Sequence, residues 1–143
     1  MDKISKETIG MTSMQKQRVY LSGGFGSDWQ EEVIKKIGNQ FTIFNPKEHN
    51  LEKPDQYWTW DIHFIRQCDI VFAFMDRKNP SGYGLALEVG AAYAYEKVII
   101  LVDEKSPRHP RFRKYYKIVH SCAHVVLPTL QKGISYLQRF QST

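Results

Sequence analysis

The chain has 143 residues, of which 42% are hydrophobic and 24% are charged, and it carries a formal net charge of +5. This length suits one domain with its own core, and the composition is that of a globular protein rather than a disordered or fibrous one. No apolar run approaches the roughly 18 residues of a membrane-spanning helix, and the N-terminus lacks the apolar core of a secretory signal. We therefore predict a cytoplasmic protein with no membrane partner.

The positive charge is concentrated in the last part of the chain. Residues 105–143 contain eight Lys or Arg and no Asp or Glu. Such a segment suits a phosphate-bearing partner, but a solvated basic surface is at least as common, and no nucleic-acid-binding motif accompanies it. We do not predict nucleic-acid binding, and the role of this segment stays open.

The first predicted strand, Arg18–Ser22, follows a polar segment that we interpret as a flexible tail over residues 1–17. The strand leads into a loop that contains Gly23, Gly24 and Gly26. A strand, a glycine loop and a helix N-terminus together present free backbone N–H groups to a polar ligand. The loop matches neither the P-loop nor the dinucleotide fingerprint, so a tight turn without a ligand is the alternative.

The segment after the glycine loop has a helical pattern. Ser27 and Gln30 have the spacing of a capping box, in which two side chains satisfy the free N–H groups of the first turn. Gly38 is a typical residue for the end of a helix. We therefore predict a helix from about Ser27 to Gly38.

A second strand is expected at Phe41–Pro46, followed by a polar loop over residues 47–56 and a helix over residues 57–68. The loop is longer than most connections of this kind, which makes it a candidate for ligand contact. The helix carries an apolar stripe, and Asp61 lies beside it, where a carboxylate needs a partner or a chemical role.

The most strand-like run is Asp69–Met75, which is continuous and apolar, as expected for a central parallel strand covered on both faces. Further strands are expected at Lys97–Val102 and Ala123–Pro128, and a closing helix at residues 130–140. The basic segment over residues 104–117 is interpreted as loop with some helix. Strands that alternate with helices predict an α/β fold with a five-stranded, mostly parallel sheet.

The cysteines and histidines do not predict a metal site. Cys68 and Cys122 are the only cysteines and are read as reduced thiols. His120 and His124 flank Cys122, but they run into a predicted strand, where residues four apart lie too far from each other to chelate one ion easily. We predict neither a metal nor a cofactor.

The stretch Asn79–Tyr95 places one acid, Glu88, among glycines and alanines just after the central strand. Glu is rarely buried in such surroundings unless it is paired, binds a ligand or reacts. In parallel sheets, ligands lie at the carboxyl ends of the strands. The glycine loop, the loop before Asp61 and the loop before Gly84 should all open at that edge, which makes Glu88 a candidate site residue, with a buried ion pair as the alternative.

Four stretches, in this order and spacing, resemble the nucleoside 2-deoxyribosyltransferase superfamily. They are Tyr20–Gln30, FNPKEHN at 44–50, the step from Asp61 to Asp69, and GYGLALEVGAAYA at 82–94 followed by KVIILV. The resemblance covers residues 18–103. It implies a flavodoxin-like three-layer sandwich, with a single deoxyribosyltransferase-like domain at residues 18–143. It also implies homo-oligomers in which a neighbouring subunit helps to close the site.

The resemblance also implies roles for individual residues. Glu88 matches the nucleophile, Asp61 a carboxylate for proton transfer or sugar binding, and Tyr20 a tyrosine near the nucleophile. We expect Glu88, near a helix N-terminus, to be ionised at neutral pH and Asp61 to hold a proton more readily. The remaining candidates are expected to bind the substrate. They are Gly23, Gly24, Phe25, Asp28, Ser81, Gly82 and Gly84.

The function implied is cleavage of the N-glycosidic bond of a deoxynucleoside and transfer of the sugar to a second base. Classical transferases have an acid shortly before the nucleophile, whereas this chain has Ser81, Gly82 and Tyr83 there, which is more typical of the related hydrolases of nucleoside 5′-monophosphates. Asp28 and Gln30, and the lack of Arg in the glycine loop, favour the transferases. A non-catalytic nucleotide-binding module is the third possibility, since a fold can persist without its chemistry.

Overall fold

The computed structural model describes residues 15–140, so most of the predicted tail lies outside the described residues. Five parallel strands form one sheet in the order β2-β1-β3-β4-β5. The strands are β1 (Arg18–Gly23), β2 (Thr42–Phe44), β3 (Ile70–Met75), β4 (Val98–Asp103) and β5 (Val125–Leu127). This order is that of flavodoxin-like folds and confirms the predicted fold class.

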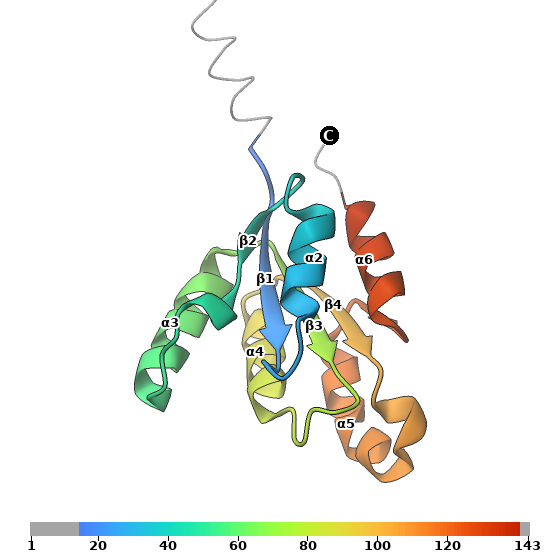
Figure 1. Ribbon diagram of the computed structural model, residues 1–143. Coiled ribbons are helices and arrows are strands. Elements are labelled where there is room, and N and C mark those ends of the chain that lie inside the picture. Colours follow the sequence, from blue (N-terminus) through green and yellow to red (C-terminus); the bar gives the residue numbers. More distant parts are fainter. Residues whose placement is uncertain (1–14, 141–143) are drawn as a thin grey trace, which may run out of the picture.

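Helices cover both faces of the sheet (Figure 1). On one face, α2 (Trp29–Ile37) and α6 (Leu130–Gln138) bury an apolar cluster against the strands. On the other face, α3 (Pro54–Gln67), α4 (Tyr83–Ala94) and α5 (Pro110–Cys122) bury a second cluster. Two short 3-10 turns, η1 (Pro46–Glu48) and η2 (Ser106–Arg108), follow β2 and β4. No helix within residues 15–140 is long and apolar enough to cross a membrane.

The alternation of side chains along β1 decides which residues reach the site. Val19 and Leu21 point into the cluster under α2 and α6, whereas Tyr20 points into the cluster under α3 and α4. Successive side chains of a strand face opposite sides of the sheet, so Ser22 lies on the same side as Tyr20. Both hydroxyls therefore face the helix that carries Glu88.

One sequence prediction about the helices is incomplete and another is wrong. Residues 104–117 were interpreted as loop with some helix, and the structure shows a full helix, α5, from Pro110 to Cys122. Of its residues only Tyr116 and Val119 are buried, so its apolar stripe is too sparse to be recognised. The capping box is also absent, because α2 starts at Trp29 and its N-cap residue, Asp28, forms no side-chain capping bond.

Gln30 has a different role from the predicted one. Its side-chain amide donates a hydrogen bond to the backbone carbonyl of Gly24 at 3.0 Å, and the indole of Trp29 donates to the same carbonyl at 2.8 Å. These bonds fix the glycine loop on top of α2. Gly23 has a φ of +154°, and a Cβ there would lie 2.7 Å from the carbonyl oxygen of Phe74, so only glycine fits at this point.

Candidate active site

The Glu88 carboxylate is held by two hydroxyl groups from β1. Glu88 lies in the middle of α4 and is 7% exposed. The Tyr20 hydroxyl donates to Oε2 at 2.5 Å, and the Ser22 hydroxyl donates to Oε1 at 2.7 Å. Because both donors are fully buried on a central strand, they fix the position of the carboxylate and favour its ionised form.

Asp61 faces the same space from α3. Its side chain is buried, and its Oδ1 lies 3.5 Å from Nε2 of His49 but accepts no hydrogen bond from any residue in 15–140. The backbone N–H of Leu51 donates to Nδ1 of His49 at 2.9 Å, which leaves the ring proton on Nε2, the nitrogen that faces Asp61. Asp61 is therefore a buried carboxyl group that faces the Nε2 nitrogen of His49.

Burial sets the pKa values of both carboxyl groups. It raises the pKa of Glu88 to about 8, although the hydrogen bonds from Tyr20 and Ser22 oppose this shift. Burial also raises the pKa of Asp61, the direction that we predicted, while its interactions with Glu88 and His49 oppose the shift. Neighbouring buried carboxyl groups influence each other's titration, so the pKa values of Asp61 and Glu88 depend on one another.

The expectation that Glu88 stays ionised at neutral pH is not met, because burial raises its pKa to about 8. It assumed a position near a helix N-terminus, but Glu88 is the sixth residue of α4, beyond the first turn in which the helix dipole acts. Burial also raises the pKa of Tyr20, and the nearby carboxylate of Glu88 adds to this shift, so Tyr20 stays protonated and remains a hydrogen-bond donor.

Glu88 and Asp61 open into a cavity of about 500 Å³ at the carboxyl ends of β1 and β2. This volume is within the range of small-molecule sites. The lining is mostly apolar and aromatic, with no Lys or Arg. It consists of Gly23, Phe25, Pro46, His49, Leu51, Tyr57, Trp58, Asp61, Tyr83, Gly84, Leu85, Leu87 and Glu88. The expected convergence of three loops at this edge of the sheet is confirmed.

The predicted site residues fall into two groups. Gly23, Phe25 and Gly84 line the cavity, and Tyr20 reaches it through its bond to Glu88. The structure places the other four away from it. Gly24 lines a neighbouring cavity of about 150 Å³, Ser81 and Gly82 line a groove of about 700 Å³ beside α5, and Asp28 has a side chain that is 94% exposed and 3.6 Å from Lys47.

Within residues 15–140, no group of three or more His, Cys, Asp or Glu side chains could hold a metal ion. His124 accepts a hydrogen bond from the backbone N–H of Ile99 through Nδ1 at 3.0 Å. His120 contacts the buried carboxylate of Asp103 at 2.7 Å. Both histidines near Cys122 therefore have partners within the fold.

The chain matches a known protein family over more than half of its length. Residues 16–106 match the family described as nucleoside 2-deoxyribosyltransferase like. The chain belongs to this family. A search of curated proteins finds no match.

Two solved structures share the fold of this deoxyribosyltransferase-like protein. A 2-deoxyribosyltransferase from Leishmania mexicana is 18% identical with a TM-score of 0.67, and the alignment covers 87% of this chain and 98% of that one. The CMP N-glycosidase BcmB from Clostridium botulinum is 21% identical with a TM-score of 0.59, over 87% of this chain and 100% of that one. The family and both relatives are named for reactions at N-glycosidic bonds, and the protein is an enzyme of this class.

Sequence reasoning missed several residues that line or support the site of this deoxyribosyltransferase-like protein. Ser22 was read only as the end of a strand, although two residues after Tyr20 it had to face the same side of the sheet. His49 lies in the long polar loop that we expected to contact a ligand, but nothing in that loop distinguished it. Tyr83 lines both the Glu88 cavity and the neighbouring groove, which no spacing could indicate.

Proposed function

We propose that the protein is a nucleoside 2-deoxyribosyltransferase. It cleaves the N-glycosidic bond of a deoxynucleoside through a covalent glycosyl-Glu88 intermediate and transfers the sugar to a second base. The observation that carries this proposal is the buried carboxylate of Glu88, which is held by Tyr20 and Ser22 in a cavity shared with Asp61. The proposed setting is cytoplasmic nucleoside salvage.

The raised pKa of Asp61 suits this chemistry. In the proposed first step, a carboxylate oxygen of Glu88 attacks C1′ of the sugar while the bond to the base breaks, and Asp61 gives its proton to the departing base. In the second step, a nitrogen of the incoming base attacks C1′, Glu88 leaves as a carboxylate, and the incoming base returns a proton to Asp61. The reactive state is therefore an ionised Glu88 beside a neutral Asp61.

The lining of the cavity favours an uncharged nucleoside over a nucleotide. None of its residues is Lys or Arg, whereas Phe25, Tyr57 and Trp58 offer apolar surface for a base. The backbone N–H groups of Ser81 and Gly82 both donate to the Asn79 side chain, at 3.2 and 3.1 Å. A phosphate would have to compete with Asn79 for these donors, so the loop before α4 is not a free phosphate cradle.

The alternative is a hydrolase of deoxynucleoside 5′-monophosphates with the same nucleophile. The fold shared with the CMP N-glycosidase and the presence of Ser81 before Glu88 support it. In that reaction, water rather than a base would attack C1′ of the intermediate.

We also propose that the protein is a homo-oligomer whose neighbouring subunit covers the rim of the cavity. Two rim residues on α4, Tyr83 and Leu87, are 78% and 62% exposed. Large apolar side chains at the mouth of a site are typical of a surface that a second protein chain covers. Light scattering after size-exclusion chromatography tests this directly, since a monomer would contradict the proposal.

One assay separates the candidate functions. The protein is incubated with deoxyinosine and adenine, and separately with deoxynucleoside 5′-monophosphates, and the products are separated by chromatography. We expect deoxyadenosine from the first mixture. Free base from the monophosphates alone would indicate the hydrolase, and no product from either would indicate a non-catalytic binding module.

The control is a pair of Glu→Ala variants on opposite faces of the sheet. Glu88→Ala should abolish product formation. Glu32→Ala changes a half-exposed acid on α2 and should leave product formation unchanged, because that side chain forms an ion pair only with Lys36, at 3.7 Å, in the described structure. Activity in the Glu88→Ala variant would contradict the mechanism.

A further inference from the structure

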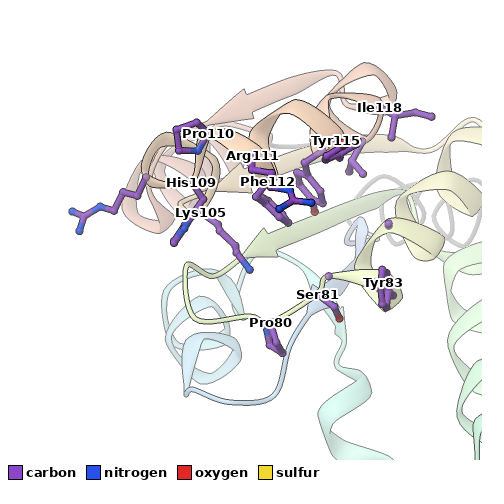
Figure 2. Close-up of a pocket in the computed structure, with 15 residues that line it drawn as sticks. Pro80, Ser81, Tyr83, Lys105, His109, Pro110, Arg111, Phe112, Tyr115 and Ile118 are labelled. Carbon is purple, nitrogen blue, oxygen red and sulfur yellow. The ribbon is translucent and has the colours of Figure 1, made fainter.

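A second cavity of the described structure is larger than the one that contains Glu88. It is a groove of about 700 Å³ between α5 and the segment that leads into α4. Figure 2 shows Arg111, Phe112 and Tyr115 on one side of this groove, and Ser81 and Tyr83 on the other. Its volume is again within the range of small-molecule sites.

The groove is positively charged. Lys105, Arg108 and Arg111 line it, and none of its lining residues is Asp or Glu. Within residues 15–140, neither Arg108 nor Arg111 has an acidic side chain within 4.0 Å. Unpaired guanidinium groups beside an apolar surface favour an anionic ligand, because they bind phosphate and carboxylate groups through two hydrogen bonds at once.

The groove also contains aromatic surface. The rings of Phe112 and Tyr116 stack with their centroids 4.6 Å apart and an angle of 27° between their planes. The ammonium group of Lys105 lies 4.6 Å from the centre of the Phe112 ring and donates a hydrogen bond to the carbonyl of Asn79 across the groove. Tyr115 is 67% exposed beside them. A planar ring can therefore stack here while a charged group on the same ligand contacts the cations.

One buried polar group of the groove has no partner. Tyr116 is only 5% exposed, and its hydroxyl forms no hydrogen bond within the described residues. Buried polar groups are nearly always hydrogen-bonded, so this hydroxyl is an exception among the described residues.

We propose that this groove binds a nucleoside 5′-phosphate at a site separate from the Glu88 cavity. The base stacks on the aromatic surface of α5, and the phosphate lies against Arg108 and Arg111. Tyr83, the first residue of the helix that carries Glu88, lines both cavities. This proposal does not rest on the proposed reaction, because it concerns binding at different residues.

The test requires a protein whose Glu88 cavity is closed. Gly84 lines that cavity and not the groove, and a Cβ at this position meets no atom within 4 Å, so Gly84→Phe adds a ring that should obstruct the cavity. Isothermal titration of this variant with the four ribonucleoside 5′-monophosphates measures binding outside the Glu88 cavity. Circular dichroism checks that the variant is folded, and Gly84→Leu replaces it if it is not.

The groove is then altered on its exposed side. In the Gly84→Phe background, Arg111→Ser with Tyr115→Ser should weaken binding of the nucleotide at least tenfold. Arg113→Ser is the matched control, because Arg113 lies on the same helix but lines a different cavity, and it should leave binding unchanged. The unphosphorylated nucleoside and inorganic phosphate should each bind at least tenfold more weakly than the nucleotide.

Three results would overturn the proposal. Loss of nucleotide binding in the Gly84→Phe variant would mean that any nucleotide occupies the Glu88 cavity. Unchanged binding after the Arg111 and Tyr115 substitutions would place the ligand elsewhere. Equal affinity for inorganic phosphate or for the nucleoside would contradict recognition of both the base and the phosphate. None of these results bears on whether Glu88 is a nucleophile.

Discussion

Replacing Tyr20 with Phe should raise the pKa of Glu88 and weaken catalysis at neutral pH. The change removes one hydroxyl and keeps the ring, which is fully buried between the sheet and α4. That hydroxyl donates to Glu88 at 2.5 Å. A hydrogen bond to a charged group contributes about 1.5–3 kcal/mol, and one pKa unit corresponds to about 1.4 kcal/mol. The pKa of Glu88 should therefore rise by about one to two units.

The sign of the effect on activity follows from the proposed role of Glu88 as an ionised nucleophile. The pKa of Glu88 is about 8, so activity should rise with pH through this value in the unmodified protein. In Tyr20→Phe the same rise should occur one to two pH units higher, and kcat/KM at pH 7 should fall about 10- to 100-fold because less Glu88 is ionised.

The assay is the pH profile of kcat/KM from pH 6 to 10, with deoxyinosine and adenine as substrates. Ser22→Ala removes the other donor to Glu88 and should shift the profile in the same direction. A profile that keeps its midpoint, or moves to lower pH, in both variants would refute the assignment of these hydroxyls as stabilisers of the carboxylate.

Three further predictions concern stability, measured by urea unfolding. Folding raises the pKa of Glu88 from 4.5 to about 8, so the stabilising contribution of its protonated form is complete below pH 4.5 and is lost as the pH rises through 8. The unfolding free energy should therefore fall between pH 6 and 9. Glu88→Gln should remove most of this fall. Gly133→Ala should cost about 1–3 kcal/mol, because its Cβ would lie 2.3 Å from Cγ2 of Val102, whereas Gly90→Ala meets nothing within 4 Å and should be neutral or stabilising. Burial alone would raise the pKa of Asp103, but hydrogen bonds from His120 and Ser106 hold this pKa below its ordinary value. Asp103→Asn should therefore lower the unfolding free energy by about 1.5–3 kcal/mol near pH 7. The loss should be smaller at pH 3, because the stabilising contribution of the ionised carboxylate disappears as the pH falls. An unfolding free energy that is independent of pH in the unmodified protein, a neutral Gly133→Ala or a neutral Asp103→Asn would each contradict the corresponding prediction.

Much of the fold follows from local patterns. The continuous apolar run at residues 69–75 predicts a central strand because only a strand covered on both faces needs no polar side, and β3 is buried throughout. The helix α5 was mostly missed because it lies on the surface with two buried residues, so its pattern is close to that of a polar loop. The failed capping box has a similar cause, since tertiary hydrogen bonds to Gly24 use the side chain of Gln30.

The candidate site was predictable in outline but not in detail. Glu88 was recognisable because an acid among small residues needs a reason to be buried. Its raised pKa was not, since it depends on how many groups surround the carboxylate in three dimensions. The positions of Ser81 and Gly82 could not be predicted from the sequence for the same reason. They precede Glu88 in the chain but line the groove beside α5, and Tyr83 lies between the two cavities and lines both.

Glu88 as the covalent nucleophile is tested most directly by mass spectrometry of the protein quenched in acid during turnover of a deoxynucleoside without an acceptor base. We expect the intact protein to gain the mass of one deoxyribosyl group, and a protease digest to place the group on Glu88. The adduct should be absent from Glu88→Gln and should disappear when adenine is added. Turnover without any adduct, or an adduct on another residue, would contradict the proposed mechanism.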